Sequence, residues 1–161
     1  MRYFPYFSAL LANYAHTLRH HFKMEGSTRM NQDKSKILVV DDNQDIRQLV
    51  SHILDADGFH VFSADDGENA RAILQNNRVD LILLDVMMPG TSGIELLSEI
   101  RTGALKSHRE VPVIMITAMA GTDDIDKALA IGADSYIVKP FRGALIREKV
   151  RAILELPQSE I

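Results

Sequence analysis

Between residues 36 and 155, short runs of apolar residues alternate with segments in which apolar residues recur every three or four positions. The short runs predict β-strands, and the periodic segments predict helices that bury one face. The predicted strands cover residues 37–40, 59–64, 79–88, 111–118 and 135–140. The predicted helices cover residues 46–54, 67–77, 94–100, 123–133 and 143–155.

The regular alternation of five strands with five helices predicts an α/β fold, in which helices cover both faces of a parallel sheet. Two strand orders are common in such doubly wound sheets, and the flavodoxin-like order 2-1-3-4-5 suits a chain of this length. We therefore expect a flavodoxin-like (βα)5 domain over residues 36–155, followed by a short tail at 156–161.

Residues 1–35 form an N-terminal extension with a different pattern. Aromatic and apolar residues recur at helical spacing up to Phe22, and residues 25–36 are polar without periodicity. This pattern predicts an amphipathic helix followed by a linker. Such a helix would suit a partner protein, a second subunit or a membrane surface. An upstream start codon, with Met30 as the true first residue, explains the same stretch, and the sequence leaves both interpretations open.

The composition excludes several classes of protein. The chain has 46% apolar and 25% charged residues, which is typical of a globular domain, and its formal net charge of −4 argues against a dedicated nucleic-acid binder. The absence of cysteine excludes disulfides and thiolate metal sites. No apolar run is long enough to span a bilayer and no secretory signal is recognisable, so we expect a cytoplasmic protein.

Acidic residues follow two of the predicted strands. Asp41 and Asp42 come directly after the first strand, and Asp85 lies near the end of the third. In the order 2-1-3-4-5, ligands bind beside the carboxyl ends of strands 1 and 3, so the three acids should share one crevice. Clustered carboxylates need a compensating cation, and Mg²⁺ prefers oxygen ligands of this kind.

Two further polar residues end the remaining strands at the same edge of the sheet. Thr117 ends the fourth strand, and Lys139 ends the fifth. Three carboxylates, a hydroxyl and an ammonium suit phosphoryl chemistry, in which Asp85 would act as nucleophile and form an acyl phosphate. Mg²⁺ and Lys139 would neutralise charge on the phosphoryl oxygens, and Thr117 would donate a hydrogen bond to one of them.

The chain resembles the receiver domain of two-component response regulators. The matching motifs are the acidic pair after "ILVV", "LILLDVMMPG" around Asp85, "VIMITA" with Thr117 and "GADSYIVKPF" with Lys139. By this resemblance Asp85 is the phosphoacceptor, and Thr117 and Lys139 bind the phosphoryl group. The resemblance also makes Asp41, Asp42, Asp85 and the backbone carbonyl of Met87 the Mg²⁺ ligands. It makes Tyr136 the switch aromatic and implies a cis bond between Lys139 and Pro140.

The resemblance implies a function in phosphorelay signalling. A sensor histidine kinase or a histidine phosphotransfer protein would donate the phosphoryl group to Asp85, and no external metabolite would be turned over. Thr117 would move inward, Tyr136 would follow, and the surface formed by residues 123–133, 135–140 and 143–155 would change for a protein target or a second copy. Because the chain ends soon after the last helix, we expect a single-domain regulator without a nucleic-acid-binding output.

Met87 and Met119 are apolar at positions that, in receivers, flank the path of the water that hydrolyses the acyl phosphate. Neither side chain offers that water a hydrogen-bond partner, so we expect a phosphorylated form that decays slowly.

The main alternative is a pseudo-receiver that binds partners without phosphorylation, although the acceptor, metal and lysine positions are all intact. An aspartate-nucleophile phosphatase of the haloacid-dehalogenase type would need an acid two residues after Asp41, where the chain has Asn43. A flavin-binding module would need a phosphate loop where the acidic sequence "DDNQD" would repel phosphate. No G-x-x-x-x-G-K-[ST] motif occurs, which argues against a nucleoside triphosphatase.

Overall fold

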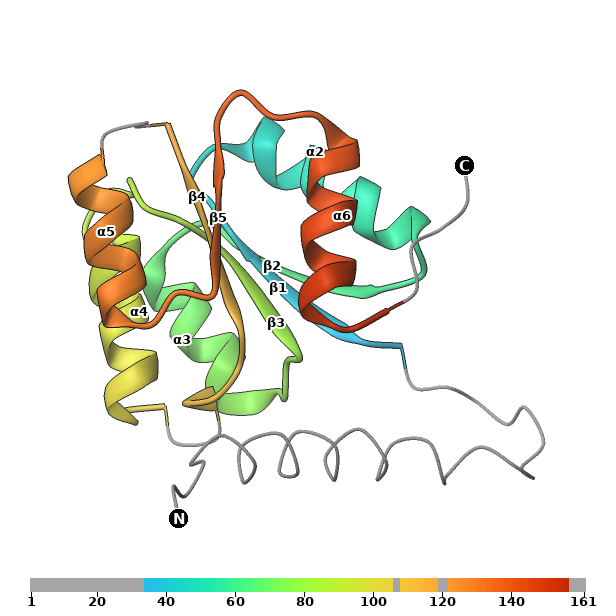
Figure 1. The fold of residues 1–161 in the computed structure, drawn as a ribbon. Helices are drawn as coiled ribbons and strands as arrows, with labels where there is room; N and C mark the ends of the chain where they lie inside the picture. Colours follow the sequence, from blue (N-terminus) through green and yellow to red (C-terminus); the bar gives the residue numbers. More distant parts are fainter. Residues whose placement is uncertain (1–33, 106–107, 119–121, 157–161) are drawn as a thin grey trace, which may run out of the picture. The chain divides into compact units, whose positions relative to one another are not determined.

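The computed structural model describes residues 34–105, 108–118 and 122–156. Five strands alternate with five helices over these residues (Figure 1). The strands are β1 (Lys36–Val40), β2 (His60–Ala64), β3 (Leu81–Asp85), β4 (Val113–Thr117) and β5 (Ser135–Val138). The helices are α2 (Gln44–Ala56), α3 (Gly67–Asn76), α4 (Gly93–Thr102), α5 (Thr122–Ile131) and α6 (Gly143–Ile153).

The five strands form one parallel sheet in the order β2-β1-β3-β4-β5. The predicted flavodoxin-like fold and strand order are therefore confirmed. The register pairs Val40 with Leu84 and Thr117 with Val138. As a result, the carboxyl ends of the central strands lie at one edge of the sheet.

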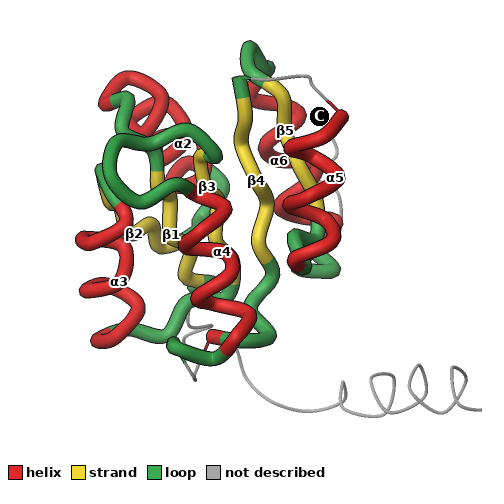
Figure 2. Tube along the Cα trace, turned by 90° about the vertical axis from the view of Figure 1, so that its left-hand side faces the viewer, coloured by secondary structure: helices red, strands yellow, loops and turns green. Residues whose placement is uncertain are grey.

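Helices cover both faces of the sheet, which explains why its central strands are apolar on both sides. Helices α2 and α6 pack on one face, and α3, α4 and α5 lie on the other (Figures 1 and 2). Every residue of β3 and β4 is buried. A strand buried on both faces has no polar face, and this accounts for the continuous apolar runs in the sequence.

Side-chain caps begin several of the described helices that follow the carboxyl ends of the strands, among them α2 and α4. The side chain of Asn43 accepts hydrogen bonds from the backbone N–H groups of Asp45 and Ile46 at the start of α2. Ser92 and Glu95 form a reciprocal capping box at the start of α4. These caps satisfy backbone donors that a helix leaves unpaired at its N-terminus, and they fix where each loop ends.

The third strand is shorter than predicted. It covers Leu81–Asp85, whereas the apolar run predicted residues 79–88. Val86 and Met88 are nevertheless buried, because they pack into the core from the loop that follows the strand. Apolar character therefore continues past the point where the sheet ladder ends.

The prediction of a helical N-terminal extension falls on residues 1–33, which lie outside the described part of the chain. Among the described helices, none combines the length and the apolar character needed to cross a bilayer.

Candidate functional site

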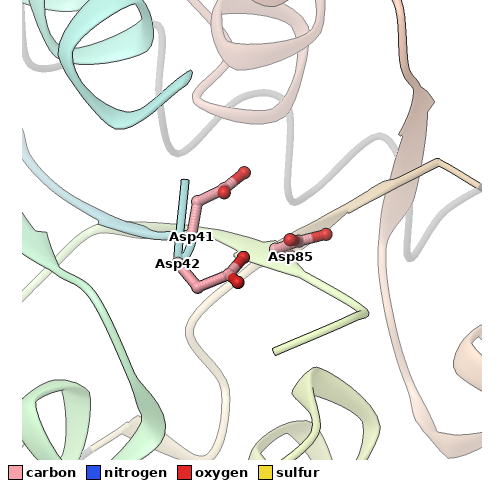
Figure 3. Close-up of side chains that lie close together, drawn as sticks. All are labelled: Asp41, Asp42 and Asp85. Carbon is pink, nitrogen blue, oxygen red and sulfur yellow. The ribbon is translucent and has the colours of Figure 1, made fainter. Parts of the chain in front are cut away.

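Three carboxylates meet at the carboxyl ends of β1 and β3. Because Val40 pairs with Leu84, the residues that follow them, Asp41 and Asp85, lie next to each other across the sheet. Asp42 continues from Asp41, and one carboxylate oxygen from each of the three acids lies within 4.8 Å of the others (Figure 3). The strand order thus brings together side chains that are more than 40 positions apart in the sequence.

Two of the three acids are buried. Asp41 is 0% exposed and Asp85 is 3% exposed, whereas Asp42 is exposed at the mouth of the site. One Asp41 oxygen accepts a hydrogen bond from the backbone N–H of Asn43 at 2.9 Å. Buried carboxylates are costly unless hydrogen bonds or opposite charges compensate them, so this arrangement requires a cation nearby.

Lys139 supplies part of that compensation. Its ammonium lies 2.7 Å from a carboxylate oxygen of Asp41 and 3.2 Å from one of Asp85. Lys139 directly follows β5, and its backbone N–H donates to the carbonyl of Thr117 at 2.7 Å. The peptide bond between Lys139 and Pro140 is cis.

The electrostatics of the site follow from burial and from charge crowding. Burial raises the pKa of the Asp85 carboxyl, and the charge of Asp41 raises it further, while Lys139 offsets only part of the effect. Burial alone would lower the pKa of Lys139. The hydrogen bond to Asp41 and the charges of Asp85 and Asp41 outweigh it, so the pKa of Lys139 is raised. The site therefore retains an excess of negative character that one ammonium does not balance.

This donor set fits a magnesium ion. Mg²⁺ selects hard oxygen ligands and is usually held by one or two carboxylates together with water and phosphate oxygens. The three clustered carboxylates match that preference, and burial together with the charge of Asp41 raises the pKa of Asp85, as expected for a carboxylate whose charge is only partly compensated.

Thr117 and Tyr136 lie on the two strands that follow β3 in the sheet. Thr117 ends β4 and is 1% exposed, whereas Tyr136 on β5 is 39% exposed. Both residues line a small apolar pocket between β4, β5 and α5, together with Met115 and Leu129. The ammonium of Lys149 on α6 lies 5.8 Å from the Tyr136 ring centroid, so this ring sits where two helices flank the last strand.

The loop of residues 86–92 connects Asp85 to α4 and is closed at its base. The N–H of Gly93 donates to the carbonyl of Val86 at 3.0 Å. A Cβ atom at Gly93 would collide with the carbonyl oxygen of Asp85, so only glycine allows this close approach. Met87 lies in this loop with its side chain 53% exposed, and its backbone N–H faces an Asp85 oxygen at 3.4 Å.

Sequence reasoning missed Arg47. Its guanidinium donates to the backbone carbonyls of Asp41 at 2.7 Å and Asp42 at 3.2 Å, and so ties the acidic pair to α2. A helical arginine one turn beyond an N-cap is usually solvent-exposed, and no sequence pattern distinguishes one that folds back.

Comparison with known proteins gives a consistent result. Residues 37–151 match the family described as the response regulator receiver domain. The transcriptional regulatory protein CpxR of Klebsiella pneumoniae subsp. pneumoniae (strain HS11286) is 45% identical over 120 residues, which are 74% of this chain and 49% of that protein. The chain thus spans about half the length of the curated relatives it matches.

Two solved structures resemble the chain over most of their length. The chemotaxis protein CheY4 of Vibrio cholerae has a TM-score of 0.70 and 33% identity, and the match covers 74% of this chain and 98% of that one. The receiver domain of the sensor histidine kinase PA1611 from Pseudomonas aeruginosa PAO1 has a TM-score of 0.69 and 30% identity, with coverage of 76% and 98%. That structure is described with a magnesium ion coordinated in its active-site cleft.

The family match, the strand order and the acids gathered at the ends of β1 and β3 agree with one another. This chain belongs to the response-regulator receiver domain family, whose members are signalling domains and not metabolic enzymes.

Proposed function

We propose that Asp85 accepts a phosphoryl group from a histidine kinase or a histidine phosphotransfer protein in a Mg²⁺-dependent reaction. The observation that supports this most directly is the position of the Lys139 ammonium, which contacts both Asp41 and Asp85 within a cluster of three carboxylates. Phosphoryl transfer needs a nucleophile and cationic groups at one place, and this site provides both.

In the proposed reaction, a carboxylate oxygen of Asp85 forms a bond to phosphorus while the bond between phosphorus and the donor histidine nitrogen breaks. The electron pair of the broken bond remains on the imidazole nitrogen. The Lys139 ammonium lies 3.2 Å from a carboxylate oxygen of Asp85, and it would face the phosphoryl oxygens. The carboxylates of Asp41, Asp42 and Asp85 and the backbone carbonyl of Met87 would hold Mg²⁺, which would supply charge neutralisation on those oxygens when bound.

Thr117 and Tyr136 are proposed to transmit the change. The Thr117 hydroxyl would donate a hydrogen bond to the phosphoryl group and would move toward it. Tyr136 lines the same small apolar pocket as Thr117 and is 39% exposed, and its ring would follow into the space that the Thr117 side chain leaves. The surface formed by α5, β5 and α6 would change with it, and a target protein or a second copy would bind one state preferentially.

Two further parts of the expected function belong to this proposal. The transcriptional regulatory protein CpxR named above is about twice the matched length, so a single-domain organisation without a nucleic-acid-binding output stays a prediction. Self-catalysed loss of the phosphoryl group is likewise proposed as part of the receiver's cycle.

The test is incubation of the full chain with Mg²⁺ and acetyl phosphate, followed by intact-mass measurement. The wild type should gain one phosphoryl group, and Asp85→Asn should gain none. Asp80→Asn is the matched control, because Asp80 is an exposed acid that directly precedes β3, at the opposite end of the strand from Asp85, and its replacement should leave the gain unchanged. A wild type that gains no phosphoryl group contradicts the proposal and favours the pseudo-receiver.

A further inference from the structure

A network of three side chains connects the loop of residues 86–92 to helices α3 and α4. The guanidinium of Arg71 on α3 makes two hydrogen bonds to the carboxylate of Glu99 on α4, at 2.7 and 2.9 Å. The same guanidinium donates a third hydrogen bond to the hydroxyl of Thr91 at 3.1 Å. Thr91 belongs to the loop, so one arginine joins two helices and the loop between Asp85 and α4.

The Thr91 side chain is held on two sides. Its hydroxyl accepts a hydrogen bond from Arg71. Its Cβ lies against Gly67, which is one turn before Arg71 on α3. A Cβ atom added at Gly67 would come within 2.8 Å of the Thr91 Cβ, which shows how closely the loop approaches α3. The loop is therefore pinned at Thr91 as well as closed at its base, where Gly93 bonds to Val86.

The geometry favours a defined role for the ion pair. An arginine that binds a carboxylate with two parallel hydrogen bonds is fixed in orientation. The Nη2 nitrogen that donates to Glu99 also donates to Thr91, so its direction toward the loop is fixed as well. The hydrogen bonds from Arg71 to Glu99, together with the positive charge of Arg71, lower the pKa of Glu99 and so favour its ionised form. Arg71 and Glu99 are both partly exposed, so their ion pair alone adds little to overall stability.

We propose that Arg71 and Glu99 are positioning residues for the metal site, and that they act by holding Thr91 and thereby the backbone of residues 86–92. The inference rests on the proposed function, because it assigns the Met87 carbonyl to the Mg²⁺ site. Three residues separate Met87 from Thr91, so the Met87 carbonyl lies between the base of the loop, closed by the hydrogen bond from Gly93 to Val86, and the position held by Arg71. Groups that orient metal ligands change metal affinity without touching the ion.

The test compares Mg²⁺ affinity of the full-length variants by titration calorimetry. Thr91→Val removes the hydroxyl and keeps the shape, and Arg71→Met removes the guanidinium. Each should weaken Mg²⁺ binding by about tenfold. Thr91→Ser keeps the hydroxyl and should retain wild-type affinity. Arg147→Met should do so as well, because it removes an arginine that joins α6 to Asp57 at the far end of α2.

A second measurement separates positioning from general loss of stability. Amide hydrogen exchange of residues 86–93 should become faster in Thr91→Val and Arg71→Met, while exchange in β1 and β4 stays unchanged. Phosphorylation by acetyl phosphate should require more Mg²⁺ in these variants and reach the wild-type rate at saturation.

Three outcomes overturn the inference. One is wild-type Mg²⁺ affinity in Thr91→Val and Arg71→Met, and another is an equal loss of affinity in Arg147→Met. Both leave the proposed function intact. The third is a wild type that binds no Mg²⁺ at all, which would overturn the proposed function together with this inference.

Discussion

Replacing Lys139 by methionine removes the ammonium that faces two buried carboxylates and keeps a side chain of similar length. At an effective dielectric constant of about 20, the attraction to Asp41 at 2.7 Å is about 6 kcal/mol and that to Asp85 at 3.2 Å is about 5 kcal/mol. Desolvation of the ammonium cancels much of this gross attraction. Loss of one partner from a buried ion pair typically costs about 3–5 kcal/mol, and we expect Lys139→Met to lower the free energy of unfolding by about that amount at pH 7.

The loss of stability in Lys139→Met should depend on pH in a definite direction. The folded-state pKa of Asp85 is raised, so this residue favours the folded state below its unfolded pKa and loses that contribution as pH rises through the folded pKa. Without Lys139 its folded pKa should rise further. The difference between variant and wild type should therefore be largest at neutral pH and should shrink in acid, where the carboxyl is protonated in both proteins.

Urea unfolding at several pH values measures this effect, with and without Mg²⁺. Lys149→Met is the matched control, because that ammonium bonds to the Ser135 hydroxyl and lies over the Tyr136 ring. Lys149→Met should lower the free energy of unfolding by less than Lys139→Met does. The reasoning is refuted if Lys139→Met is as stable as the wild type at pH 7, or if its cost grows as pH falls.

Three further predictions concern other parts of the chain, and Met119, in the last of them, lies outside the described residues. Gly93→Ala places a Cβ against the Asp85 carbonyl and should lower the free energy of unfolding by about 3 kcal/mol or more, measured by urea unfolding. Arg47→Met leaves the backbone carbonyls of Asp41 and Asp42 without their side-chain donor. It should lower the free energy of unfolding by about 1–2 kcal/mol and should weaken Mg²⁺ binding in calorimetry. The phosphorylated wild type should decay slowly, and Met119→Glu or Met87→Glu should shorten its lifetime in a phosphate-release assay, because a carboxylate can hold the attacking water. Unchanged lifetimes in both variants would contradict this last prediction.

The fold and the gathering of the three acids could be predicted because both depend on local patterns and on topology. Apolar periodicity distinguishes strands from helices, and the order of a parallel sheet places the ends of β1 and β3 together. Asp41, Asp42 and Asp85 follow from these two facts. Tyr136 could be placed on a strand, but its exposure depends on how α5 and α6 flank β5, which periodicity does not encode.

Contacts between long side chains could not be predicted in the same way. Arg47 and Arg71 look like ordinary surface residues of amphipathic helices, and their partners depend on rotamers and on backbone turns of distant segments. Leu49 shows the opposite error, since its helical spacing suggests burial and yet 49% of the residue is exposed. Single apolar residues on the surface are common, so the pattern fixes the buried face of a helix better than its edges.

The net charge of the site would change on phosphorylation, and this bears on the different roles expected for Lys139 and Thr117. Three carboxylates and one ammonium leave two uncompensated negative charges, which a divalent cation would balance. Phosphorylation would replace the single charge of Asp85 by nearly two, so the site would become negative again. Lys139 contacts two of the acids, and Thr117 ends the adjacent strand. The phosphorylated site would therefore require a further hydrogen-bond donor that the unphosphorylated site does not, and we expect residues of β4 to move only in the phosphorylated state. Tyr136 lines the same pocket as Thr117, so we expect its ring to move with them.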